Sequence, residues 1–341
     1  MDQVVEIDGG QGEGGGQVLR TAISLAALYS RPLHIFNIRA GRARPGLKRQ
    51  HLTCLRAAQE LCSGRLEGDT SNSSEIRFEP GPVKAGEYHF SVGTAGSALL
   101  VFQTVIWPLL FAKGNSRVVF EGGTHNPMAP TFDFVDRCFV PIMRRMGARL
   151  DLHLEKRGFM PAGGGRFVAE IEGGTTLSPI DLLERGPLVE RRATGLVANL
   201  PGTIAIRELS EIRNILQWRH EECLPLVDQD ADCTGNVLLL EIAHEHVSEL
   251  VSVIGERQLT AEMVAAKAAE EVQAYLDCEA PVGEHLADQL IIPFALAGGG
   301  SFRSTELSTH AETNVDTVRL FSDTRIATSR DDQGVSFTFA A

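Results

Sequence analysis

A run of glycines near the N-terminus encloses a single acidic residue. Six of the eight residues from Gly9 to Gly16 are glycine, and Glu13 lies among them, between a strand-like segment and a helical pattern. Gly10, Gly12 and Gly15 match the G-x-G-x-x-G pattern of a dinucleotide-binding loop, whose backbone amides bind pyrophosphate at a helix N-terminus. The alternative is a tight strand-to-helix turn that needs positive φ angles and binds nothing.

A basic segment follows the second predicted strand. That strand, residues 33–38, ends at Arg39, where a dinucleotide-binding fold would place the acid that holds a ribose hydroxyl. Residues 39–49 contain no acidic residue. They contain five basic side chains, which are Arg39, Arg42, Arg44, Lys48 and Arg49. The first predicted helix adds Arg20. Guanidinium groups on a turn constrained by proline and glycine suit a compact anion, such as a terminal phosphate, although a solvated loop is the alternative.

Composition narrows the class of protein. The 341 residues are 43% hydrophobic, which indicates one large or two ordinary globular domains. A net charge of −12 argues against a general nucleic-acid binder. No signal peptide is expected, and the most apolar segment, residues 98–112, is too short and too broken to span a membrane. Six scattered cysteines without a C-x-x-C motif indicate a reducing, cytoplasmic location.

One pattern recurs three times along the chain and predicts the architecture. Each copy reads βαβαββ, with alternating strands and amphipathic helices, so we expect a layered α+β fold. The predicted helices cover residues 17–30, 46–62, 98–112, 132–147, 285–300 and 311–323. The predicted hairpins pair residues 73–80 with 87–93, 149–158 with 165–173, and 325–332 with 334–340. If the copies pack around a pseudo-threefold axis, loops from distant parts of the chain converge on one site.

The third copy is interrupted by a segment with its own pattern. Strands at 193–200 and 235–245 alternate with helices at 206–218 and 260–278, which predicts a small inserted αβ domain. The expected division is a core over residues 1–185, the insert over 186–280, and the remainder of the third copy over 281–341.

Six segments together resemble the RNA 3′-terminal phosphate cyclases, and the resemblance covers essentially the whole chain. The segments are 8–22, 37–52, 93–97, 157–165, 285–290 and 309–314. It implies three βαβαββ repeats with an inserted αβ domain, an architecture shared with the enolpyruvyl transferases. It also implies an ATP-dependent reaction in which histidine is adenylated, AMP moves to the RNA 3′-phosphate, and the 2′-hydroxyl displaces AMP to leave a 2′,3′-cyclic phosphate.

The resemblance also implies roles for single residues. His310 matches the adenylated histidine, and its place before a helix expected from Ala311 puts a neutral imidazole at the positive helix end. Glu13 matches a metal-ligating glutamate for Mg²⁺ or Mn²⁺. The implied ligands of the RNA phosphate or the triphosphate are Arg20, Arg39, Arg42, Lys48 and Gln50. The implied contacts to ATP are Gln103, Pro130, His285, Leu286, Ala287, Asp288 and Gln289.

Other functions remain open on sequence alone. A cyclase-like ribosome-assembly factor would share the fold and lack the nucleophilic histidine, whereas an enolpyruvyl transferase would form no covalent nucleotide. A dinucleotide-binding dehydrogenase is disfavoured, because the βαβαββ repeat does not produce a doubly wound parallel sheet. The expected partners are RNA 3′-phosphate ends and a second copy in a homodimer, with no membrane. Residues 157–165 are expected to form a structural turn.

Overall fold

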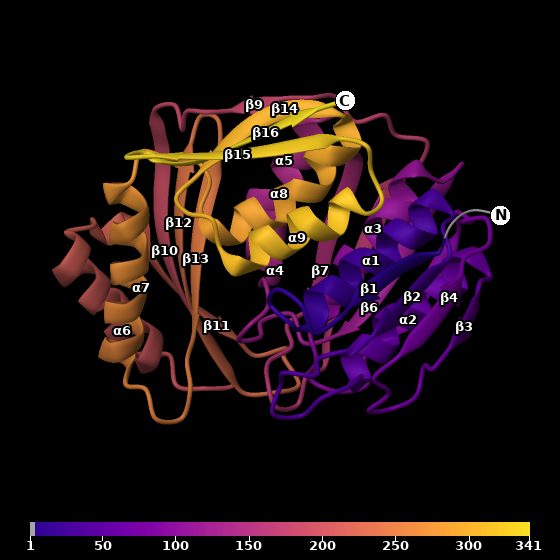
Figure 1. The fold of residues 1–341 in the computed structure, drawn as a ribbon. Helices are drawn as coiled ribbons and strands as arrows, with labels where there is room; N and C mark the ends of the chain where they lie inside the picture. Colours follow the sequence, from indigo (N-terminus) through magenta and orange to yellow (C-terminus); the bar gives the residue numbers. More distant parts are fainter. Residues whose placement is uncertain (1–3) are drawn as a thin grey trace.

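The computed structural model describes residues 4–341 as four sheets of four strands with helices packed against them (Figure 1). The predicted α+β class is confirmed. The first sheet is mixed, because its first two strands are parallel and the other pairs antiparallel. Its strands in spatial order are β1 (Val5–Asp8), β2 (Leu33–Phe36), β4 (Ile76–Glu79) and β3 (Arg65–Glu67), with helices α1 (Gly16–Tyr29) and α2 (Arg49–Cys62) in the connections. A dinucleotide-binding fold has a mostly parallel sheet, so the antiparallel pairs here exclude it.

Two further sheets have the same internal order and the same pattern of parallel and antiparallel pairs. The second contains β5 (Glu87–Ser91), β6 (Asn115–Gly122), β8 (Gly165–Glu172) and β7 (Arg149–Lys156). The third contains β9 (Asp181–Leu182), β14 (Gly299–Ser304), β16 (Gly334–Ala340) and β15 (Arg325–Asp331). Their helices are α3 (Ala98–Phe111), α4 (Phe132–Phe134), the π-helical turn η1 (Val135–Phe139), α5 (Val140–Arg145), α8 (Glu284–Ala297) and α9 (Thr309–Arg319).

The fourth sheet lies between β9 and α8 in the chain and has its own small core. Its strands in spatial order are β11 (Cys223–Asp228), β10 (Leu188–Ala198), β12 (Gly235–His244) and β13 (Ser248–Ile254), with the 3₁₀ turn η2 (His220–Glu222), α6 (Thr203–Leu216) and α7 (Ala261–Asp277). Residues such as Ile212, Leu240 and Val272 pack together there, separately from the main core. In Figure 1 this unit occupies the side of the molecule opposite the N-terminal sheet.

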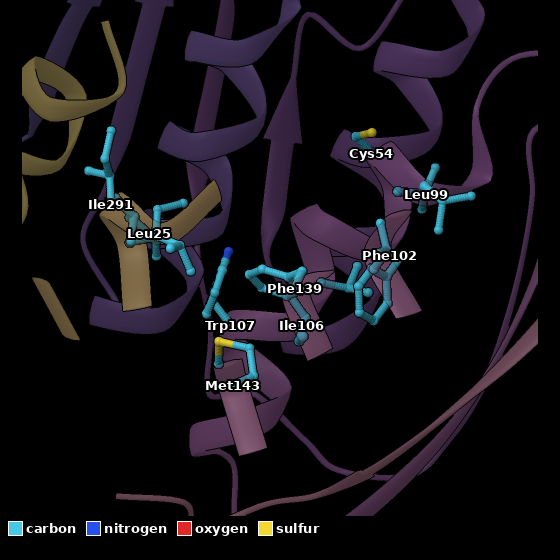
Figure 2. Packing of buried hydrophobic residues seen from close by; sticks show 14 of the residues in the cluster. Leu25, Cys54, Leu99, Phe102, Ile106, Trp107, Phe139, Met143 and Ile291 are labelled. Atoms are coloured by element: carbon cyan, nitrogen blue, oxygen red, sulfur yellow. The ribbon is translucent and has the colours of Figure 1, made fainter. Parts of the chain in front are cut away.

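The main core forms where helices from all three similar units meet. Figure 2 shows Leu25, Phe102, Trp107, Phe139 and Ile291, which come from α1, α3, η1 and α8, converging between the sheets. The rings of Trp107 and Phe139 meet edge to face with centroids 6.0 Å apart. Within residues 4–341, no helix is long and apolar enough to cross a membrane. The apolar segment 98–112 is the buried helix α3, as predicted.

Several predicted elements differ from the structure. The hairpin expected from 73–80 and 87–93 is wrong: β4 pairs with β2 and β3, while β5 joins the next sheet beside β6. The intervening residues include Pro80 and Pro82, which cannot donate backbone hydrogen bonds to a hairpin ladder. The insert has two more strands than predicted, and one of them, β11, contains Pro225 at a sheet edge, where a missing N–H is tolerated.

Candidate active site

The glycine-rich loop packs directly against side chains of the site. Gly12 and Gly14 have φ angles of +60° and +61°, which glycine adopts without strain. A Cβ on Gly12 would overlap the hydroxyl of Thr313 in α9, and a Cβ on Gly15 would overlap the carboxylate of Glu13. A Cβ on Gly16 would lie 2.8 Å from Nη1 of Arg20. The glycines are therefore required by the side chains that this loop must approach.

Glu13 is tied to two other elements. Its backbone N–H donates to Oγ1 of Thr313 at 2.9 Å, which joins the loop to α9. Its carboxylate forms an ion pair with Arg42, whose Nη2 also donates to the carbonyl oxygen of Glu13 at 3.0 Å. The second carboxylate oxygen, Oε2, is buried and has no hydrogen-bonding partner in the described part of the chain. This orphaned oxygen fits one ligand position of a hard divalent cation.

Arg20 lies in α1, beside Gly16 and His51. Its guanidinium makes no hydrogen bond or ion pair with any of residues 4–341, although it is only partly exposed. Burial lowers its pKa, and the nearby Asp288 acts in the opposite direction. A partly buried cation without a protein partner is best satisfied by an anion from outside the chain.

The other predicted phosphate ligands are engaged with protein atoms. Arg39 donates through Nη1 to the carbonyl oxygens of Arg44 at 2.8 Å and Gly46 at 3.0 Å, and so holds the basic loop. Lys48 donates to the Pro45 carbonyl at 2.8 Å and to Asn72 at 2.7 Å.

Gln50 acts between two of the similar units. Its Oε1 accepts from the N–H of Ser97, the residue before α3, at 3.0 Å. This contact joins α2 to the start of α3. The assignment of Arg39, Lys48 and Gln50 to RNA therefore stays a prediction.

Arg20, Arg39, Arg42 and Lys48 form the group of cations that we call the basic pocket. His51 lies beside it and has no role predicted from the sequence. It is buried beside Gly16, and burial together with the charges of Arg20, Arg39 and Lys48 lowers its pKa to about 3. Its Nδ1 accepts from the N–H of Lys48 at 3.0 Å, so the proton of the neutral ring is on Nε2. Because Nε2 faces Gly16 and the Arg20 guanidinium, His51 adds an uncharged donor to this pocket.

His310 lies in the first turn of α9. The helix begins at Thr309, two residues earlier than predicted, and Ser308 caps it by accepting from the N–H of Ala311 at 3.2 Å. The His310 side chain is exposed, and its Nδ1 lies 2.5 Å from Oε1 of Gln17 in α1. The opposite ring nitrogen, Nε2, makes no hydrogen bond with the described residues. Loop 9–16, α1 and α9 thus bring Glu13 and His310 to one site.

The segment expected to contact the nucleotide divides into exposed and buried residues. The side chain of His285, in the first turn of α8, is 79% exposed and available to stack on a base. Leu286 and Ala287 are completely buried in the core, so neither residue is exposed to a ligand, and their assignment to ATP stays a prediction. Asp288 accepts from Gln17 and Asn314, and burial raises its pKa. Gln289 has a buried Oε1 without a partner in the described residues.

Gln103 and Pro130 lie on the second unit. Gln103 is partly exposed on the otherwise apolar helix α3, and its amide has no hydrogen-bonding partner within residues 4–341. Pro130 is partly exposed in the connection between β6 and α4. No contact joins either of them to the His310 network in the described structure, so their roles stay predictions.

The sequence analysis did not assign roles to the residues that hold His310 in place. Gln17, Thr21 and Asn314 lie within the motifs that carry the family resemblance, but helical periodicity predicts only that they face the core. The useful signal was their polarity, since a polar side chain on a buried helix face needs a partner.

Together these features define a class of protein: an α+β enzyme whose site combines an exposed histidine with an arginine and a carboxylate oxygen that have no partner among residues 4–341. Such a set is suited to phosphate groups.

Comparison with known proteins identifies the family. Residues 11–328 match the family model described as RNA 3′-terminal phosphate cyclase. A protein of that name from Pseudomonas fluorescens is 47% identical over 323 residues, covering 95% of this chain and 94% of the relative. Another, from Koribacter versatilis, is 46% identical over 318 residues, covering 93% of this chain and 90% of the relative. The chain belongs to the RNA 3′-terminal phosphate cyclase family, a family of ATP-dependent enzymes, as the motifs predicted.

Proposed function

We propose that this protein converts the 3′-terminal phosphate of RNA into a 2′,3′-cyclic phosphate through a histidine–AMP intermediate. Membership of the cyclase family supports the reaction. The observation that carries the mechanism is the placement of His310: its ring is exposed in the first turn of α9, and Gln17 occupies Nδ1. Nε2 is thus the ring nitrogen left to attack a phosphorus atom.

The reaction proceeds in three displacements. The lone pair of Nε2 forms a bond to the α-phosphorus of ATP, and the bond to pyrophosphate breaks with its electron pair on the leaving oxygen. A phosphate oxygen of the RNA end then takes the adenylate from His310, giving RNA(3′)pp(5′)A. The 2′-hydroxyl attacks the terminal RNA phosphorus, loses its proton and expels AMP.

The basic pocket is assigned to the phosphate groups of both substrates. Arg20 supplies an unneutralised guanidinium, and Arg42 is exposed next to Glu13, which lies in the loop that contacts α9. Arg39, Lys48 and Gln50 hold the pocket in shape and have further donors for an RNA end. In this proposal the exposed His285 stacks on adenine opposite Pro130, and Gln103, Asp288 and Gln289 supply polar contacts. Leu286 and Ala287 anchor the segment in the core.

Glu13 is assigned to a divalent metal ion, Mg²⁺ or Mn²⁺. No cluster of three or more His, Cys, Asp or Glu side chains suited to a metal exists within residues 4–341. The unpartnered Oε2 of Glu13 still fits, because Mg²⁺ commonly takes one or two carboxylates and completes its shell with phosphate oxygens and water. Such an ion offsets the charge of the phosphates during transfer.

The test is covalent labelling. The protein is incubated with α-³²P-ATP and Mg²⁺, or Mn²⁺, without RNA, then denatured and examined for label. We expect label on the wild type that is acid-labile and alkali-stable, as a phosphoramidate is, and no label on His310→Ala. A folded wild type without label would refute the mechanism and favour the non-catalytic cyclase-like factor, whereas a demand for phosphoenolpyruvate would favour the enolpyruvyl transferase.

The finer architecture belongs to this proposal. We infer that the three similar units pack around a pseudo-threefold axis, with a core over 1–185 and 281–341 and an insert over 186–280. The identical strand orders of three sheets and the separate core of the fourth support this division. All six cysteines lie within residues 4–341 and are free, in keeping with the expected reducing cytoplasm. The possible homodimer stays a prediction.

A further inference from the structure

The imidazole of His310 is held from a distant part of the chain. Oε1 of Gln17, in the first helix, lies 2.5 Å from Nδ1 of His310, although 293 positions separate the two residues. Neither α9 itself nor the glycine loop supplies this contact. The orientation of the ring is therefore set by α1.

The orientation of the Gln17 amide follows from its second partner. Its Nε2 donates to Oδ1 of Asp288, and the same oxygen also accepts from Nδ2 of Asn314, so it acts as an acceptor on both sides. The amide nitrogen must therefore face Asp288 and the amide oxygen must face His310. Since that oxygen only accepts, Nδ1 of the neutral imidazole carries the proton, and the lone pair is on Nε2.

The carboxylate behind Gln17 is itself anchored. Nδ2 of Asn314 donates to Oδ1 of Asp288 at 3.2 Å and to its carbonyl oxygen at 2.9 Å. Oδ1 of Asn314 accepts from the hydroxyl of Thr21 at 2.9 Å. Thr21 lies one helical turn after Gln17, and Asn314 one turn after His310, so α1 and α9 are joined directly at two successive levels. Asp288 of α8 contacts both helices. Gln17, Thr21 and Asn314 are buried.

We propose that Gln17, backed by Asp288 and Asn314, is a positioning residue that fixes His310 in the tautomer protonated at Nδ1. The proposal rests on the proposed role of His310 as nucleophile. In that reaction the Nε2 lone pair forms the bond to the α-phosphorus while the bond to pyrophosphate breaks. Nδ1 keeps its proton throughout, so no base has to remove a proton before attack.

The same contacts act on the adenylated state. The imidazole becomes cationic once Nε2 is bonded to phosphorus, and the Nδ1–H bond to Gln17 becomes charge-assisted. Asp288, one amide group away, offsets the new charge. When the RNA phosphate takes the adenylate, the electron pair of the nitrogen–phosphorus bond returns to Nε2. The starting tautomer is restored without transfer of a proton to solvent.

The experiment reads the tautomer directly. We would label the protein with ¹⁵N-histidine and assign the His310 nitrogens by their loss in His310→Asn. In the wild type at neutral pH we expect a protonated Nδ1 and an unprotonated Nε2. In Gln17→Met, a side chain of similar length without an acceptor, we expect the signals to shift to the Nε2-protonated form. A wild-type ring protonated at Nε2, or an unchanged tautomer in Gln17→Met, would overturn the proposal.

A kinetic readout separates positioning from binding. The rate of adenylation should fall about 10- to 100-fold in Gln17→Met, the scale seen when a metal-bound histidine loses its second partner. The ATP concentration for half-maximal rate should change less than twofold. The matched control is Gln273→Met in α7, where Gln273 donates to Asp277 at 2.7 Å on the exposed surface. It should leave the tautomer and the rate unchanged.

A second variant covers a failure of Gln17→Met to fold. Asp288→Asn keeps the shape of the carboxylate and removes the obligatory acceptor, so the Gln17 amide can rotate and both tautomers should appear. A single unchanged tautomer in Asp288→Asn would contradict the proposal. If the wild type shows the expected tautomer and is never adenylated, the proposed function fails while the contact between Gln17 and His310 stands.

Discussion

Glu249 should make the stability of this protein fall as the pH rises. It lies in β13 of the insert, 7% exposed, and its Oε2 accepts from the N–H of Gly283, the residue before α8, at 2.9 Å. The N–H of Leu250 donates to Oε1 at 3.4 Å. Burial raises the pKa of this carboxyl from 4.5 to about 7, with Glu284 adding to the effect and Arg185 opposing it.

The sign and size follow from proton linkage. Below pH 4.5 both the folded and the unfolded chain hold the proton on Glu249, and the group contributes no pH dependence. Between pH 4.5 and 7 the unfolded chain releases the proton and the folded chain keeps it, so the free energy of unfolding falls. At about 1.4 kcal/mol per pH unit, the loss approaches roughly 3 kcal/mol above pH 7.

The assay is urea unfolding of the wild type and Glu249→Gln at pH 5 and pH 8.5. Glutamine keeps an acceptor for Gly283 and carries no charge. Because the unfolded chain is already partly ionised at pH 5, the variant should lose about 2.5 kcal/mol less than the wild type between the two pH values. The control is Glu245→Gln, at an exposed position in the turn between β12 and β13, and its pH dependence should follow that of the wild type. Equal pH dependence in the wild type and Glu249→Gln would refute the reasoning. Glu208, whose pKa burial also raises to about 7, contributes equally to both proteins and cancels.

Two further predictions concern the basic pocket and the insert. Arg42→Lys keeps the charge and loses the planar fork, so the cyclisation rate should fall about 10- to 100-fold, measured against Arg44→Lys; a wild-type rate would contradict the assignment. Gly235→Ala places a Cβ that overlaps Cγ and both Cδ atoms of the Phe159 ring, which should cost about 1–3 kcal/mol in thermal or urea unfolding. Gly41→Ala, with open space around the new methyl group, should be near neutral, and equal stability of the two variants would show that the packing is misjudged.

Local patterns were sufficient to predict most of the fold. The helices follow the apolar spacing of their own residues, and the paired strands of the hairpins at 149–173 and 325–340 are close in the sequence. The sequence signal for each of these elements is therefore local. The pairing of β5 with β6 across α3 is not local, which explains why β4 and β5 were wrongly joined into a hairpin. The strand β9 is only two residues long and gives no periodic signal.

The sequence predicts candidate site residues, but it does not predict their contacts. Motifs point to Glu13, Arg42 and His310 as candidates, and the structure brings the loop of Glu13 to the helix of His310 through Thr313. Their chemical roles stay predictions. The pairing of Glu13 with Arg42 and of His310 with Gln17 depends on which helices touch, and no spacing in the sequence encodes that. The sequence predicts a structural turn for segment 157–165. In the structure its Phe159 stacks on the buried His125, with ring centroids 5.1 Å apart.

The site joins α1 and its preceding loop to α9, which is distant in the sequence, and this has a consequence for synthesis. The N–H of Glu13 reaches Thr313 across 300 positions, and Gln17 reaches His310 across 293. A ribosome therefore completes the glycine loop, the basic pocket and the whole insert before the first atom of α9 exists. Until then, α1 presents the buried residues Gln17 and Thr21 without their partners. Translation that stops before His310 would leave a chain with the basic pocket but without the proposed nucleophile, so we expect such a fragment to be inactive.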